Sequence, residues 1–301
     1  MKLSALRYLV AFADQLNFSR AAEQCQVSQP SLSVALQRLE EELDVGLIER
    51  SKHQLALTEV GQRVVAQARK TLEEVGRIET VAQSGKNPLT SRFRLGVIHT
   101  IAPYLLPDLI SALRQTAPEL TLYIEESTTA LLADHLKYGT IDAAIVALPF
   151  NIAGVETEVL YEEAFEVVVP KGHAWAGRTH VNPFELGDEE VLVLKAGNCF
   201  REQVLDACPD ISHTDASMRQ GHSIETIRAM VASGYGVSVL PKSALSALYQ
   251  SDMLVAIPFE EPSPSRRVAL AWRHSSLQEP VQAALLSAIR AINKPAYQVL
   301  C

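Results

Sequence analysis

The spacing of apolar residues changes once along this chain, and that change constrains the fold more than any other feature. Before about residue 90, apolar residues recur every three or four positions, as in amphipathic helices. From Arg92 onward, short apolar runs of strand length alternate with helical stretches, which is typical of α/β domains. Because 301 residues are too many for one ordinary core, we expect a helical N-terminal domain followed by an α/β module.

The first ninety residues predict three short helices and then a hairpin. Ser19 and Ser28 are the expected N-caps of the second and third helices. Pro30 falls in the first turn of the third helix, where a missing amide donor costs nothing. Strand-like runs at 47–50 and 54–57 then predict a winged hairpin.

A long helix is predicted after the hairpin, from its N-cap Thr58 to about Ser84. Residues on it repeat at alternating steps of four and three, which indicates a coiled-coil seam and therefore a homodimer. This seam consists of Gly61, Val65, Ala68, Leu72, Val75, Glu79 and Ala82. The segment 84–88 ends the helix and is the expected hinge.

The second part of the chain predicts a series of strands and helices of ordinary length. Strands are expected at 93–98, 120–125, 143–148, 165–169, 191–194, 236–240 and 268–272. Helices are expected at 101–116, 129–138, 201–207, 224–232 and 281–292.

Composition excludes several classes of protein. No apolar run approaches the roughly 18 residues that cross a bilayer, and no cleavage pattern follows the N-terminal apolar run, so a cytoplasmic protein is expected. Four cysteines are too few for a secreted disulfide framework, and the histidines lack metal-ligand spacing. The net charge is −8, but residues 1–90 are neutral, and DNA binding needs only a local basic face.

The third predicted helix has the short polar residues that a DNA-reading helix presents to base edges in the major groove. Arg38 and Arg50 are suited to phosphates, one from the helix and one from the wing. A generic three-helix packing unit would also have a polar outer face, so this pattern alone leaves both interpretations open. The candidate DNA-binding residues are Gln29, Pro30, Ser31, Ser33, Gln37, Arg38, Arg50 and Lys52.

The segments 17–23, 27–33 and 39–50, together with the run that begins at Thr58, resemble the LysR-type transcriptional regulators. The resemblance implies a winged helix-turn-helix at 1–58 and a linker helix with its hinge at 59–90. It also implies a periplasmic-binding-protein-like α/β effector module of two Rossmann-like subdomains. We expect subdomain I at 91–162 plus 267–301 and subdomain II at 163–266. Members of this family usually assemble as tetramers on DNA.

Cys199 and Cys208 flank the short helix expected at 201–207. If the stretch between them is helical, its ends lie about 13 Å apart, whereas a disulfide needs α-carbons within about 7 Å. Closing the bond would therefore unwind the helix and convert oxidation into a change of shape. Cys199 is the better nucleophile because it lies at a helix start, with Arg201 nearby. Two ordinary buried cysteines remain the alternative from these residues alone.

The segments 96–107 and 198–203 resemble the peroxide-sensing branch of the LysR family, the OxyR proteins. The resemblance implies that Cys199 is the peroxidatic residue and Cys208 the resolving one. It further implies a peroxide pocket formed by Thr100, Thr129, Asn198, Arg201 and Arg266. Asn198 departs from this branch, which often has histidine there, and asparagine cannot relay a proton. Thr100 and Thr129 could instead be helix N-caps, and Arg266 could form a surface salt bridge.

The resulting hypothesis is a regulator that activates oxidative-stress genes and is not an enzyme. Its expected partners are double-stranded promoter DNA, RNA polymerase, hydrogen peroxide, and a thiol reductant such as a glutaredoxin or thioredoxin. A homodimer through the linker helix, assembled into a homotetramer, is expected, without cofactor, metal or membrane. The alternative is a LysR-type regulator that responds to a small organic effector bound between the two subdomains.

Overall fold

The computed structural model describes residues 1–50, 55–83, 89, 92–214, 219–249, 251–276, 278–292 and 294–299. Contacts divide the chain into two compact units. The first comprises residues 1–86 with Tyr138–Thr140, and the second comprises the rest. No helix among the described residues is both long enough and apolar enough to span a bilayer.

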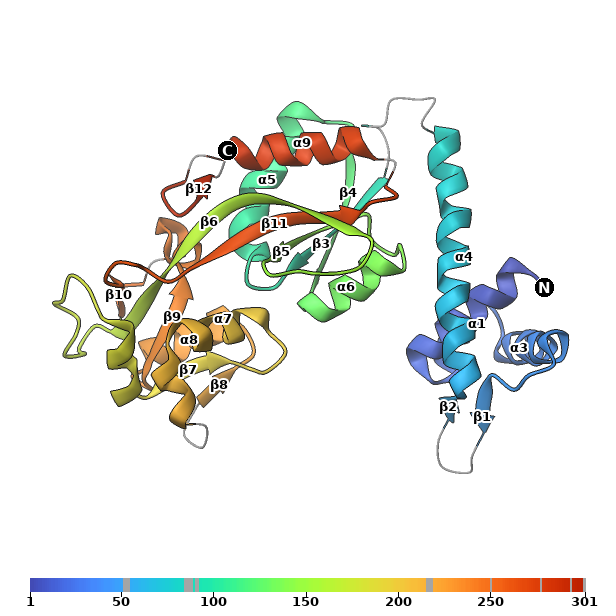
Figure 1. The fold of residues 1–301 in the computed structure, drawn as a ribbon, viewed down its shortest axis with the longest axis horizontal. Coiled ribbons are helices and arrows are strands. Elements are labelled where there is room, and N and C mark those ends of the chain that lie inside the picture. Colours follow the sequence, from blue (N-terminus) through green and yellow to red (C-terminus); the bar gives the residue numbers. More distant parts are fainter. Residues whose placement is uncertain are drawn as a thin grey trace. The chain divides into compact units, whose positions relative to one another are not determined.

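The N-terminal unit is a winged helix-turn-helix followed by a long helix (Figure 1). Its core is formed by apolar residues from all four helices and the wing, including Leu9, Phe12, Leu32, Leu36 and Leu39. Strands β1 and β2 pair antiparallel and form the predicted hairpin. The elements are α1 Leu3–Gln15, α2 Phe18–Gln24, α3 Gln29–Leu43, β1 Ile48–Arg50, β2 Leu55–Leu57 and α4 Glu59–Gln83.

Two of the three predicted N-caps are confirmed and one is wrong. The Ser28 hydroxyl accepts from the Ser31 amide at 3.3 Å, and Thr58 Oγ1 accepts from the Gly61 amide at 2.8 Å. Helix α2, however, begins one residue before Ser19, and its cap is Asn17, whose Oδ1 accepts from the Ser19 and Arg20 amides. Asparagine and serine are equally good N-caps. Asn17 is the cap because α2 begins at Phe18, which leaves Ser19 inside the first turn.

The first half of the predicted dimer seam on α4 faces its own domain. Val65 and Ala68 are 5% and 3% exposed and belong to the core of the N-terminal unit. Gly61 is buried, and an added Cβ would lie 2.1 Å from the Leu47 carbonyl oxygen. These three residues therefore cannot form an interchain seam. Leu72 packs partly against the same core, while the side chains of Glu79 and Ala82 and the hinge 84–88 lie outside the described residues.

Gly61→Ala tests this packing. Alanine normally stabilises a helix by about 1 kcal/mol relative to glycine, but here its methyl group would collide with backbone. We expect the free energy of unfolding of the N-terminal unit to fall by about 2 kcal/mol, measured by urea denaturation. The matched control is Gly46→Ala, where an added Cβ meets nothing within 4 Å. Equal stability of both variants would contradict the packing.

The second unit is an α/β module with a long mixed sheet, whose strand order is β4-β3-β5-β11-β6-β9-β7-β8. Strands β10 and β12 also pair with β6. The strands are β3 Arg92–Ile98, β4 Thr121–Ser127, β5 Ala143–Ala147, β6 Val155–Pro170, β7 Val191–Leu194, β8 Arg219–Gly221, β9 Val237–Pro241, β10 Leu254–Pro258, β11 Ser265–Arg273 and β12 Gln298–Val299. The α-helices are α5 Ala102–Thr116, α6 Thr129–Lys137, α7 Cys199–Ala207, α8 Ile224–Ala232 and α9 Glu279–Arg290.

The sheet carries two separate apolar cores, which share strand β6. The first core lies around β3 and β5 with helices α5, α6 and α9. The second lies around β7 and β9 with α7 and α8. Residues 155–164 of β6 pair with β11, and residues 165–168 pair with β9, so one strand runs from one core into the other (Figure 1). The sequence predicted only the part of β6 at 165–169.

Candidate functional site

Helix α3 presents its predicted DNA-binding residues away from the core. Leu32, Leu36 and Leu39 are buried on the inner face. Ser33 is half-buried, and the exposed candidates on the outer side are Gln29, Pro30, Ser31, Gln37 and Arg38. Arg50 ends β1, but its side chain and all of Lys52 lie outside the described residues.

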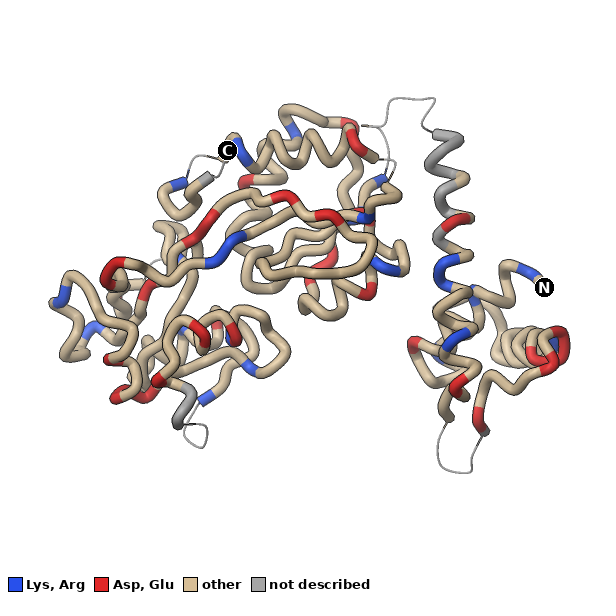
Figure 2. Tube along the Cα trace, in the orientation of Figure 1, with Lys and Arg blue, Asp and Glu red and all other residues tan. Residues whose placement is uncertain are grey.

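The acidic end of α3 has a structural role that the sequence pattern did not indicate (Figure 2). One Glu40 carboxylate oxygen accepts from the amides of Leu47 at 2.7 Å and of Ile48 at 3.0 Å. It thereby fixes the start of the wing to α3. Glu42 is exposed and pairs with the N-terminal amine at 2.7 Å.

Cys199 is the first residue of α7, and the turn before it is built around Gly197. Gly197 has φ of +95°, a conformation that other residues rarely adopt. Asn198 is the N-cap position but makes no side-chain cap bond. Its Nδ2 instead donates to the Lys195 carbonyl at 3.0 Å, which braces the turn. Cys199 is partly buried and packs against the first core.

Cys208 follows the other end of α7 and lies within the second core, where it is fully buried. Burial raises the pKa of its thiol to about 12, so it is protonated at neutral pH. Both cysteines are free thiols, and the nine-residue helix Cys199–Ala207 begins at the first cysteine and ends just before the second. A helix of that length rises about 13 Å. The two sulfurs therefore belong to different cores at opposite ends of an intact helix.

Arg266 and Glu163 form a fully buried ion pair at the junction of the two cores. They are opposite residues on β11 and β6, and both side chains are 0% exposed, with Arg266 Nη2 2.7 Å from Glu163 Oε2. Figure 2 shows the acidic positions along β6 and the basic segment of β11 that adjoin here. The surface salt bridge considered for Arg266 is therefore wrong, because the pair is internal.

The Arg266 guanidinium also contacts residues beside Cys199. It lies over the Phe200 ring at 5.2 Å from the centroid and donates through Nη1 to Thr100 Oγ1 at 3.0 Å. Burial has the largest single effect and would lower the pKa of Arg266, but the charges of Glu163, Tyr161 and Cys199 together with the Glu163 hydrogen bond outweigh it, so the pKa is raised.

Thr100 and Thr129 lie at the same edge of the sheet. Ile98 and Ser127 are opposite residues at the ends of the parallel strands β3 and β4, and each threonine follows two residues later. Thr100 is buried and is not an N-cap, since α5 begins at Ala102. Thr129 begins α6, and its Oγ1 is buried with no hydrogen-bond partner among the described residues. The N-cap alternative therefore fails for both hydroxyls.

Arg201 is buried on α7 and directed at strand β7. Its Nη1 donates to the Leu194 carbonyl at 3.2 Å, and its Nε lies 3.8 Å from Glu202. The bond to Leu194 attaches the first turn of α7 to the end of β7. No group of three or more potential ligands suited to a metal ion occurs among the described residues.

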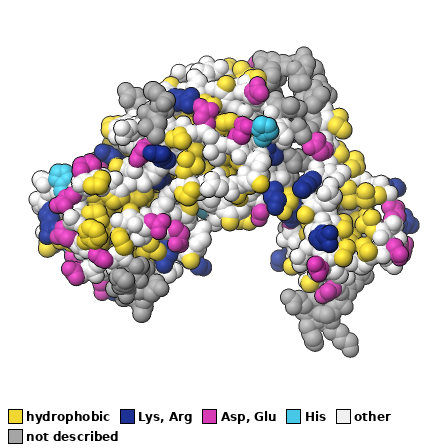
Figure 3. Space-filling view, in the orientation of Figure 1, with side chains coloured by type: hydrophobic (Ala, Val, Ile, Leu, Met, Phe, Trp, Pro, Cys, Tyr) yellow, Lys and Arg dark blue, Asp and Glu magenta, His cyan; other side chains and the backbone are white. Residues whose placement is uncertain are grey.

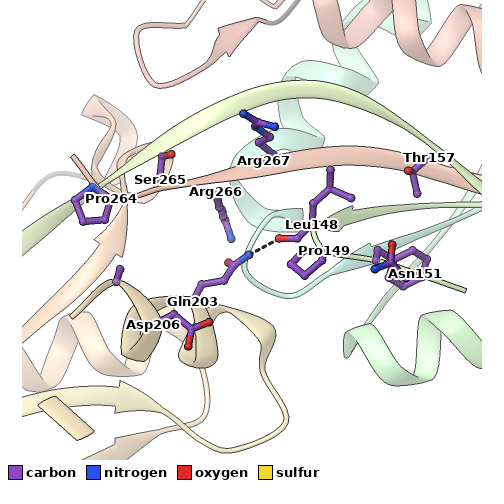
Figure 4. A pocket seen from close by; sticks show the side chains of 12 residues that line it. Leu148, Pro149, Asn151, Thr157, Gln203, Asp206, Pro264, Ser265, Arg266 and Arg267 are labelled. Atoms are coloured by element: carbon purple, nitrogen blue, oxygen red, sulfur yellow. Dashed lines mark hydrogen bonds between the residues drawn. The ribbon is translucent and has the colours of Figure 1, made fainter. Parts of the chain in front are cut away.

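An open pocket with a volume of about 730 Å³ adjoins this site (Figure 4). It is lined by α7, by the loop after β5 and by the start of β11. Gln203 Nε2 donates across it to the Leu148 carbonyl at 3.0 Å, while Gln203 Oε1 is buried without a partner among the residues described. Arg266 and Arg267 leave β11 on opposite sides, with Arg266 toward α7.

Family models match most of the chain. The model "Bacterial regulatory helix-turn-helix protein, lysR family" matches residues 3–62, and "LysR substrate binding domain" matches residues 86–293. The chain belongs to the LysR family. This family consists of transcriptional regulators, and the predicted fold class, a helix-turn-helix domain with an α/β effector module, is confirmed.

The relatives place the chain in the OxyR branch. It is 35% identical to "DNA-binding transcriptional dual regulator OxyR" of Escherichia coli K12, over 97% of this chain and 95% of that protein. Full-length OxyR from Pseudomonas aeruginosa, in a cysteine-to-aspartate variant, matches with a TM-score of 0.78 and 44% identity, covering 99% and 98% of the two chains. A hydrogen-peroxide-bound OxyR variant from Corynebacterium glutamicum has a TM-score of 0.65 at 31% identity, covering 96% and 91%.

Cys208 should be inaccessible in the reduced, folded protein. Its raised pKa of about 12 leaves little thiolate at pH 8, and its burial blocks reagents. We expect iodoacetamide to label Cys199 at least tenfold faster than Cys208, as measured by peptide mass spectrometry, and to label both at similar rates in urea. Rapid labelling of Cys208 in the native protein would contradict its place in the core.

Proposed function

We propose that this chain senses hydrogen peroxide and regulates transcription at promoter DNA, with a Cys199–Cys208 disulfide as its switch. The curated relatives include proteins named "Hydrogen peroxide-inducible genes activator". The observation that carries the proposal is the position of Cys199, a free, partly buried thiol at the start of α7, next to Phe200, whose ring lies under the Arg266 guanidinium. The chain acts as a regulator and not as a turnover enzyme.

The proposed oxidation proceeds in two balanced steps. The Cys199 thiolate attacks one peroxide oxygen, the O–O bond breaks, and the leaving oxygen takes a proton and departs as water. Cys199 is left as a sulfenic acid. The Cys208 thiol then attacks this sulfur, a second water leaves, and the disulfide forms. A thiol reductant such as a glutaredoxin or thioredoxin returns the pair to thiols.

The proposed peroxide pocket is formed by Thr100, Thr129 and Arg266 around Cys199. The register of β3 and β4 supports the two threonines as neighbours, and the unpartnered Thr129 hydroxyl supports a role in binding substrate. Hydroxyls placed in this way can hold peroxide in line with the sulfur. Asn198 and Arg201 support the pocket indirectly, because their hydrogen bonds to the Lys195 and Leu194 carbonyls brace the turn before α7 and the end of β7.

The switch follows from the separation of the two thiols. An intact α7 keeps them too far apart to bond, so disulfide formation requires α7 to unwind and Cys208 to leave the second core. The Gln203–Leu148 hydrogen bond joins α7 to the loop after β5 and would be lost in that change. We propose that this rearrangement is transmitted to the DNA-binding domains.

The wider assembly is part of the same proposal. Helix α3 reads promoter DNA with the candidate residues given above. The two apolar cores support a division into subdomain I at 91–162 plus 267–301 and subdomain II at 163–266. The protein acts in the cytoplasm as a homotetramer of linker-helix dimers that recruits RNA polymerase. Acidic and basic side chains are mixed over the visible face of the larger unit (Figure 3). The positive charge that binds DNA must therefore be concentrated in one part of the protein and not spread over its surface.

A second candidate function is the binding of a small organic effector. The open pocket of about 730 Å³ beside α7 favours it, because this volume is within the range of ligand sites. An effector in this open pocket would raise the thermal midpoint of the protein, and the DNA response to it would persist in Cys199→Ser. Loss of every response in Cys199→Ser would favour the peroxide switch.

Mild peroxide should join Cys199 to Cys208 in the wild type, whereas Cys208→Ser should stop at the Cys199 sulfenic acid. Peptide mapping with a sulfenic-acid trap measures both products. A DNase footprint on one operator should change on oxidation of the wild type and not of Cys208→Ser. If the wild type forms no 199–208 bond under mild peroxide, the proposed switch is wrong.

Thr129→Val should slow the reaction of Cys199 with peroxide by about 10- to 100-fold, since it removes a hydroxyl while keeping the shape of the side chain. The matched control is Thr128→Val. The Thr128 hydroxyl already accepts from the Leu131 amide at 3.4 Å, so its loss should leave the rate within about twofold. Similar rates for Thr129→Val and the wild type would exclude Thr129 from the pocket.

A further inference from the structure

The Arg266 guanidinium is almost fully used by the protein around it. Its Nε donates to Glu163 Oε2 at 2.8 Å, and its Nη2 contacts the same oxygen at 2.7 Å. Nη2 also donates to the Thr100 carbonyl at 3.0 Å, and Nη1 donates to Thr100 Oγ1 at 3.0 Å. A guanidinium has five N–H groups. Counted over the described residues, these contacts leave one N–H, on Nη1, for a substrate.

Glu163 is what fixes this orientation. Its Oε2 binds Arg266, and its Oε1 accepts from the Ser243 amide at 2.8 Å, so the carboxylate cannot rotate without losing a bond. An unpaired guanidinium in a site that is 0% exposed would be strongly unfavourable. The carboxylate therefore decides which way the N–H groups of Arg266 point.

The orientation of Arg266 in turn sets the role of the Thr100 hydroxyl. A hydroxyl that accepts a hydrogen bond from a guanidinium can still donate its own hydrogen, but in another direction. Arg266 occupies one side of Thr100 Oγ1, so the hydroxyl hydrogen must point elsewhere. This arrangement leaves two hydrogen-bond donors with fixed directions, which are the remaining Nη1–H of Arg266 and the O–H of Thr100. Such donors can stabilise the charge that develops on a leaving peroxide oxygen.

We propose that Glu163 is a positioning residue for the oxidation of Cys199, acting through Arg266 to aim the Nη1–H and Thr100 O–H donors at the leaving oxygen of hydrogen peroxide. This inference rests on the proposed peroxide-sensing function and adds a residue to it. Glu163 itself touches neither substrate nor sulfur. It acts only by holding Arg266, and its effect is confined to reactions that need those two donors.

Two reagents separate positioning from a general effect on the thiol. Peroxide needs a donor for its leaving oxygen, whereas iodoacetamide needs only an accessible thiolate. In Glu163→Gln, we expect the rate constant for peroxide at Cys199 to fall at least tenfold, while the rate constant for iodoacetamide stays within threefold or rises. The ratio of the two rate constants, measured on the Cys199 peptide in full-length reduced protein, is the readout.

The matched control is Glu162→Gln on the neighbouring position of β6. Glu162 faces the other side of the strand and pairs with Arg267 at 3.6 Å, so both rate constants should remain at wild-type values. Combining Glu163→Gln with Thr100→Val tests the pathway. If Glu163 acts through Thr100 and Arg266, the rate constant for peroxide in the double variant should fall by a much smaller factor than the product of the two single-variant factors.

Each outcome decides the inference. If the wild type itself does not react with peroxide at Cys199, the proposed function fails. If the wild type reacts and Glu163→Gln reacts equally fast, or loses both reactivities in parallel, only the positioning role fails. Should Glu163→Gln not fold, Glu163→Asp keeps the charge but withdraws the carboxylate by one methylene. It should show the same selective loss of peroxide reactivity, and an unchanged ratio would overturn the inference.

Discussion

The buried ion pair between Arg266 and Glu163 is the interaction on which the rest of the effector module depends. It lies where β6 and β11 pass from one apolar core toward the other. Arg266 donates to Thr100, which follows β3, and Glu163 accepts from the Ser243 amide, which follows β9. Removing either charge would leave the other buried and unpaired, which is far more costly than losing a surface pair. This ion pair is therefore a rigid reference against which a neighbouring helix can move.

In the proposed switch, helix α7 is the element that moves, because the cysteines at its two ends belong to different cores. Cys199 packs against the first core and Cys208 lies inside the second. Burial keeps Cys208 protonated and away from solvent, so it cannot act until α7 has opened. The reduced state gains the packing of Phe200, Val204 and Cys208, and the oxidised state gains a covalent bond. The switch is an equilibrium between these two states, and oxidation of Cys199 shifts it toward the disulfide.

Helical periodicity predicted most of the long helices, but not what each apolar face contacts, and the roles of Cys199 and Cys208 came from the resemblance. The spacing of Gly61, Val65 and Ala68 is that of a seam, and the face they form is covered by their own domain. Glu163 was missed although alternation along β6 points to it: Tyr161, Glu163 and Phe165 share a face, and all three are buried. A charged residue on an apolar face requires an internal partner. The polar first half of β6 was missed because its pairing with β11, more than its composition, makes it a strand. Strand β10 was overlooked although its run Leu254–Pro258 has the apolar composition of a strand.

Amide hydrogen exchange across residues 199–208, in the reduced protein and after stoichiometric peroxide, tests the central claim most directly. The account predicts that protection of α7 amides falls by several orders of magnitude on oxidation, since an open segment exchanges without unfolding the domain. Amides of β6 and β11 beside the Arg266–Glu163 pair should keep their protection. Oxidised protein with a 199–208 bond and fully protected α7 amides would contradict the account.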